Sequence, residues 1–129
     1  MSLTVIQNEA APLPIGPYSQ GIVHNGVFYP AGQIGLNPAT SALEEGIEAQ
    51  ARRAFANLAL LCEAANTDIS KTIKVTLLLA DMADFAVVNQ VMMDVFKAPF
   101  PARTCFAVKG LPKGCLLYTS PSPRDSTSS

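Results

Sequence analysis

The fold is decided by residues 47–79, which read IEAQARRAFANLALLCEAANTDISKTIKVTLLL. In the first part, apolar residues recur at steps of three and four, which predicts a helix with one apolar face. The helix begins either at the capping-box pattern of Ser41 and Glu44 or nearer to Ile47. Residues 73–79 alternate at first and then become wholly apolar, as in a strand that is covered on both faces.

Shorter strands are predicted on the N-terminal side of this stretch. Residues 3–6 predict a short strand, and three prolines over residues 11–17 break any regular element. Asn25 and Gly26 lie between two apolar runs and both tolerate positive φ, so they predict a β-hairpin.

A second helix and a further strand are predicted on the C-terminal side. Asp81 is suited to cap a helix with a buried apolar side, and the prolines of residues 98–101 stop that helix. Residues 104–108 predict a strand, and residues 115–119 begin a final one. The low-complexity end from Ser120 to Ser129 is expected to be disordered.

These elements predict an α+β domain, with one mixed β-sheet and two helices packed on one face. The chain has 129 residues, of which 49% are hydrophobic and only 15% charged. No third helix is available for the second face of the sheet. Other copies of the chain are therefore expected to cover that face.

Charge and composition exclude several classes of protein. The net charge is −1 and no basic run occurs, so neither nucleic acid nor a membrane is an expected partner. The first residues show no signal-peptide pattern, and we expect the protein in the cytoplasm. Three scattered cysteines and one histidine support neither a disulfide framework nor a zinc site.

Four motifs, taken together and in order, resemble the signatures of the RidA/YjgF family. They are IGPYSQG at residues 15–21, AGQI at 31–34, FPARTC at 100–105 and LPKG at 111–114. The resemblance implies a chorismate-mutase-like (YjgF) fold that assembles as a homotrimeric barrel with three clefts between subunits. It also implies hydrolysis of 2-imino acids, such as 2-iminobutanoate and 2-iminopropanoate, to 2-keto acids and ammonia. Neither a metal nor an organic cofactor is implied.

The resemblance assigns Arg103 to binding the substrate carboxylate, in a pocket just large enough for a three- or four-carbon acid. The planar fork of an arginine binds a carboxylate bidentately, which fits this role. The alternative is an arginine at a strand start that pairs with an acid. Cys105 is expected to act through its backbone carbonyl, which in the family is thought to hold the attacking water, because no base is placed to activate its thiol.

Four further residues are candidates for the same cleft. Tyr18 follows a rigid Gly-Pro turn that would hold its ring against the cleft, although a core tyrosine would fit the same pattern. Gly32 matches a position where the backbone lies beside the substrate, or else it is a bulge glycine. Asn89 lines the cleft from the second helix or is an exposed polar residue. Ala31 stands where many members carry serine or threonine, so one hydroxyl contact is lost.

The C-terminal end departs from the family. Family members carry a glutamate fifteen residues beyond the arginine, assigned to proton transfer or water positioning, whereas this chain has Tyr118. We therefore divide the chain into a RidA/YjgF-like domain at 1–114 and an atypical tail at 115–129. The tail resembles read-through sequence that replaces the true C-terminus. A sheet without its natural last strand would leave an open edge.

Three functions are compatible with the sequence. The first is imine deaminase activity, weakened by the missing carboxylate. The second is a non-catalytic trimer that binds small carboxylates. The third, ribonuclease or translation inhibition, is attributed to some members of the family but is disfavoured by the acidic balance of this chain, whose pI is about 5.7.

Overall fold

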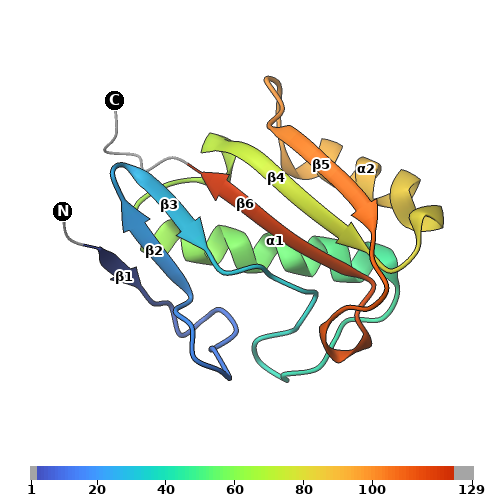
Figure 1. Cartoon of the computed structure of the whole chain (residues 1–129), viewed down its shortest axis with the longest axis horizontal. Helices are drawn as coiled ribbons and strands as arrows, with labels where there is room; N and C mark the ends of the chain where they lie inside the picture. Colours follow the sequence, from blue (N-terminus) through green and yellow to red (C-terminus); the bar gives the residue numbers. More distant parts are fainter. Residues whose placement is uncertain (1–2, 124–129) are drawn as a thin grey trace.

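The computed structural model describes residues 3–123, and it contains two helices behind a mixed arrangement of strands (Figure 1). Short 3₁₀ turns separate several of the elements. The helices are α1 (Ile47–Ala64) and α2 (Phe85–Val95). The strands are β1 (Thr4–Ile6), β2 (Gly21–His24), β3 (Val27–Pro30), β4 (Thr72–Leu79), β5 (Ala102–Ala107) and β6 (Leu117–Pro123). The 3₁₀ turns are η1 (Ile69–Lys71), η2 (Met82–Asp84) and η3 (Pro112–Gly114).

The strands form two three-stranded sheets, in the orders β1-β2-β3 and β5-β4-β6. Only β4 and β5 run parallel, and every other pair is antiparallel. Gln33 and Thr119 join the two sheets by exchanging backbone hydrogen bonds of 2.8 and 3.0 Å. The predicted α+β class with a mixed sheet is confirmed, in two parts that meet at this bridge.

Both helices cover the same side of the strands, which also agrees with the prediction (Figure 1). The apolar face of α1 packs on the buried side chains of β4, and Phe55 meets Phe96 edge-on with ring centroids 5.5 Å apart. A second apolar cluster lies between the C-terminal half of α1 and the first sheet, around Phe28 and Leu61. No helix among residues 3–123 has both the length and the hydrophobicity to cross a membrane.

The start of α1 agrees with one of its two predicted starts, whereas the start of the second helix differs from the prediction. Gly46, with φ of 85°, precedes α1 at the N-cap position, and no side chain caps the helix there. The carboxylate of Glu44 contacts Asn37 and Arg53, so the capping box does not form, and the alternative start at Ile47 is confirmed. Asp81 does cap a helical turn, but this turn is η2, where its side chain accepts a hydrogen bond from the Ala83 amide.

The last strand, β6, lies between β3 and β4, with its register to β4 set by pairs such as Leu78 with Tyr118. The predicted beginning of a strand before residue 119 is confirmed, but the expected open edge is not found. The prediction of disorder from Ser120 onward is wrong for residues 120–123, because strand β6 continues to Pro123. Residues 124–129 lie outside the described part.

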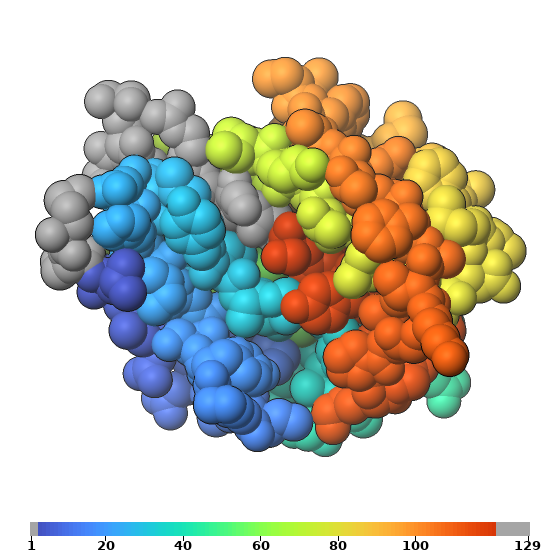
Figure 2. Space-filling model, in the orientation of Figure 1, coloured from blue at the N-terminus to red at the C-terminus, as the bar shows by residue number. Residues whose placement is uncertain are grey.

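No helix covers the face of the strands seen in Figure 2, which is opposite to α1 and α2. Leu78 pairs with both Phe106 and Tyr118 and alternates with buried neighbours, so these three side chains share that face. Phe106 and Tyr29 are each about half exposed there. Soluble monomers rarely expose an apolar patch of this kind unless it is an interaction site.

Candidate functional site

Arg103 lies on β5 opposite Val75, whose side chain is buried under the helices, so the arginine also points to the helix side. Its guanidinium is held by three residues of α2. Nη1 donates to Asn89 Oδ1 and lies 3.6 Å from the Met92 sulfur. The guanidinium carbon lies 4.9 Å from the centre of the Phe85 ring, within cation–π range.

No acid pairs with Arg103 among the described residues. The ion pairs there join Arg52 to Glu48 and Asp94, and Arg53 to Glu44. The alternative interpretation of Arg103 as an ion-pair arginine is therefore wrong for residues 3–123. Asn89 fixes one guanidinium nitrogen, and the exposed fork retains N–H groups that suit a carboxylate.

Cys105, two residues further along β5, is half-buried on the same side as Arg103. Burial raises the pKa of its thiol, and the nearby Arg103 charge lowers it by less. The thiol is therefore not an activated nucleophile. The Val108 amide donates to the Leu79 carbonyl at 2.9 Å, so the backbone groups of Val108 point toward β4. Because backbone groups alternate in direction along a strand, those of Cys105, three residues earlier, point the other way. The Cys105 carbonyl thus points away from β4, at the edge of the described sheet.

The other predicted residues lie around a cavity of about 710 Å³. Tyr18, Ala31 and Gly32 all line it. Tyr18 is 52% exposed, so it is not a core tyrosine. The remaining lining residues include Leu13, Ile15, Ile34, Leu36, Pro38 and Tyr118. A water molecule in the liquid takes about 30 Å³. Measured against this, the cavity is many times larger than a three- or four-carbon acid, which has only a few non-hydrogen atoms.

Gly32 lies directly under the ring of Tyr118. A Cβ added at Gly32 would lie 2.0 Å from Tyr118 Cζ, far inside any real contact. The glycine is therefore required by close approach of the ring. Tyr118 thus borders both the cavity and the Gly32 backbone. The resemblance matches this position to a family glutamate.

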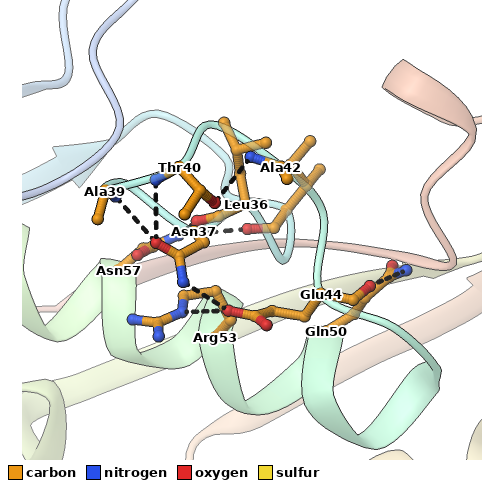
Figure 3. Close-up of polar contacts among 10 residues, drawn as sticks. Leu36, Asn37, Ala39, Thr40, Ala42, Glu44, Gln50, Arg53 and Asn57 are labelled. Atoms are coloured by element: carbon orange, nitrogen blue, oxygen red, sulfur yellow. Dashed lines mark hydrogen bonds and ion pairs between the residues drawn. The ribbon is translucent and has the colours of Figure 1, made fainter.

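One wall of the cavity is the loop at 36–44, which a polar network fastens to α1 (Figure 3). The Glu44 carboxylate accepts hydrogen bonds of 3.1 Å from both Asn37 Nδ2 and Arg53 Nε. Asn57, fully buried in α1, donates to the Leu36 carbonyl at 2.9 Å. Sequence reasoning missed this network. The only signal was Glu44 itself, which the capping-box pattern explained differently.

The predicted site residues thus form two groups within one chain. Arg103, Asn89 and Cys105 lie together, whereas the cavity residues lie elsewhere. Tyr118 pairs with Leu78 and Arg103 pairs with Val75, and these two β4 positions point to opposite faces. One chain therefore does not bring the two groups together.

No group of three or more metal-ligating side chains exists among residues 3–123. His24 ends β2 as a half-buried residue, and its Nδ1 is buried without a hydrogen-bond partner among residues 3–123. Cys62 is buried in the second apolar cluster, and burial raises the pKa of its thiol to about 12.

The sequence of the chain matches a known protein family over most of its length. Residues 8–117 match the family described as Endoribonuclease L-PSP. The chain belongs to this family, which is the RidA/YjgF family, and it has the α+β fold of that family.

Individual relatives carry different names. The RutC family protein y4sK of Sinorhizobium fredii is 43% identical over 111 residues, covering 84% of this chain and 87% of the relative. Human 2-iminobutanoate/2-iminopropanoate deaminase is 40% identical over 111 residues, covering 85% and 81%. The structure of E. coli TdcF with bound serine superposes with a TM-score of 0.89 at 32% identity, covering 95% and 99%. The family thus includes imine deaminases and members named otherwise.

Proposed function

We propose that the chain is an imine hydrolase that converts 2-imino acids to 2-keto acids and ammonia. The human relative at 40% identity carries the name of this activity. TdcF, a structural relative, binds serine, a small molecule with a carboxylate next to the carbon that bears nitrogen. The single observation that carries the proposal is Arg103, which has no acid partner among residues 3–123 and whose fork is oriented by Asn89.

The reaction needs water and no redox partner. The oxygen of water attacks C2 of the imine, and the C=N electron pair moves to nitrogen. Both protons of the attacking water pass from the added oxygen to nitrogen, the C–N bond breaks, and ammonia leaves as the C=O bond forms. Arg103 holds the carboxylate during these steps, and the outward Cys105 carbonyl accepts a hydrogen bond from the attacking water.

We propose further that the two groups of residues meet between copies of the chain in a homotrimer. Arg103, Asn89 and Cys105 of one copy would face Tyr18, Ala31 and Gly32 of the next. The opposite orientation of the two groups within one chain supports this arrangement. The uncovered apolar face, with Phe106 and Tyr29, offers surface for assembly.

The test is ammonia and keto-acid release from freshly generated 2-iminopropanoate. We expect Arg103→Ala to lower kcat/KM by at least about tenfold, the usual loss for a charged hydrogen bond. Arg52→Ala is the matched control, because that arginine already pairs with Glu48 and Asp94 on the surface. Equal rates for Arg103→Ala and the parent would remove Arg103 from the mechanism. No rate above buffer for the parent would remove the activity itself.

A second function, carboxylate binding without turnover, is favoured by Tyr118, since a phenol replaces the expected carboxylate beside Gly32. Calorimetry that detects 2-oxobutanoate binding while imine hydrolysis stays at the buffer rate would select this function. For the tail at 115–129 we propose a non-native end. Reading the genomic locus beyond codon 114 tests this, and a family-like strand with a glutamate there would support it.

A further inference from the structure

The walls of the cavity are mainly apolar. Residues 11–15 contribute Ala11, Pro12, Leu13 and Ile15, and residues 34–38 contribute Ile34, Leu36 and Pro38. Ile15 is 85% exposed and Leu13 59%, so both offer hydrocarbon surface that no other described part of the chain covers. All of these residues precede the atypical tail.

The polar side chains deep in the lining are already bonded within the protein. Gln20, 2% exposed, donates to the carbonyls of Asn8 and Pro12 and accepts from the Asn8 amide. Gln33 Nε2 donates to the Ala31 carbonyl at 3.2 Å. The charged lining residues, Glu9 and Lys113, are exposed. A polar or charged substrate side chain would therefore find few free partners inside.

The wall is also held in one position. Asn57 and Gln50 of α1 donate to the carbonyls of Leu36 and Glu44, at 2.9 and 3.0 Å. A Cβ added at Gly35 would lie 2.4 Å from the Gln50 backbone, so the loop and α1 are in close contact there. A wall fixed in this way discriminates ligands by the fit of their apolar surface rather than by rearranging around each one.

From these observations we infer that the site prefers 2-imino acids with a branched or aromatic hydrocarbon side chain over those with a methyl side chain. The inference rests on the proposed function and names its substrate class. With the carboxylate on Arg103 of a neighbouring copy, the side chain would extend onto the wall formed by Ile15 and Leu36. Pocket contacts of this kind discriminate by about 10–200-fold per methylene.

The experiment compares 2-imino-4-methylpentanoate with 2-iminopropanoate, each generated by an amino-acid oxidase with catalase present. We expect kcat/KM to be at least about tenfold higher for the branched imine. The binding of the matching keto acids, 4-methyl-2-oxopentanoate and 2-oxopropanoate, is measured by calorimetry, with at least about a tenfold difference in Kd expected in the same direction.

Ile15→Ser tests the wall, because its exposed side chain is not needed for folding. We expect it to lower the branched-to-methyl ratio at least about threefold, given about 0.8 kcal/mol per buried methylene. Met93→Ser, also exposed but on α2 and away from the cavity, should leave the ratio unchanged. Equal kcat/KM values for the two imines would overturn the inference alone. If neither imine is hydrolysed, the deaminase proposal fails, and the keto-acid Kd values still decide the preference.

Discussion

Replacing Tyr118 by glutamate tests what the end of the chain does to catalysis. The ring of Tyr118 lies on the Gly32 backbone and borders the cavity, so a carboxylate placed there would reach the substrate region. Correctly placed acid–base groups contribute about 10²–10⁴ to a rate, and the new side chain is not optimised. We therefore expect Tyr118→Glu to raise the rate of imine hydrolysis by at least about tenfold.

The assay is ammonia release from 2-iminopropanoate, measured from pH 5 to pH 9, with Tyr118→Gln as the matched control. Both variants remove the same half-buried ring, so they share any loss of packing against Gly32, which we follow by thermal unfolding. Only the glutamate variant should gain rate as its carboxylate loses its proton. Equal rates for the two variants across this pH range would refute the reasoning, because the gain would then not come from a carboxylate.

Substitutions at Asn89 and Gly32, and a rise in pH, should each have a measurable effect. Asn89→Ala should raise KM about fivefold or more with little change in thermal stability, because Arg103 loses the acceptor that orients it. Gly32→Ala should lower the free energy of unfolding by about 1–3 kcal/mol, since its Cβ overlaps the Tyr118 ring, and Tyr118→Ala should relieve most of that loss. The raised pKa of Cys62, about 12, means that the folded state keeps this proton after the unfolded chain loses it. Stability is thus full below about pH 9 and falls from there to pH 12, by about 1.4 kcal/mol per pH unit from this residue.

Each of these predictions has a direct check. Gly110→Ala serves as the control for Gly32→Ala, because a Cβ at Gly110 meets no atom within 4 Å. If Asn89→Ala lowers kcat and leaves KM unchanged, the residue does not orient the carboxylate anchor. Denaturant unfolding at pH 8 and pH 10 measures the effect of Cys62, and Cys62→Ala should flatten the pH dependence.

The elements of the fold could be predicted because their signals are local. The apolar spacing of α1 and the turn chemistry of Asn25 and Gly26 each act within a few residues. Asn25 and Gly26 do adopt positive φ, of 52° and 75°. The start of α1 was ambiguous because Glu44 satisfies a local pattern, whereas its actual partners, Asn37 and Arg53, are chosen by the tertiary structure.

The end of the chain shows the limit of composition as a guide. Ser120 and the residues after it have the composition of a disordered segment, yet β4 offers a row of backbone partners that pairs with them as far as Pro123. The candidate site could be predicted residue by residue through the family resemblance. Its division into two groups could not, because the direction of each side chain depends on strand register, which the sequence alone leaves open.

This division has a consequence for mixtures of damaged chains. A copy with Arg103→Ala keeps its cavity, and a copy with a blocked cavity keeps its arginine, so each variant alone should be impaired. In the proposed homotrimer, two such variants unfolded and refolded together at equal amounts would form an intact cleft about one time in four. Two impaired preparations would then regain activity on refolding together, without any change in either sequence.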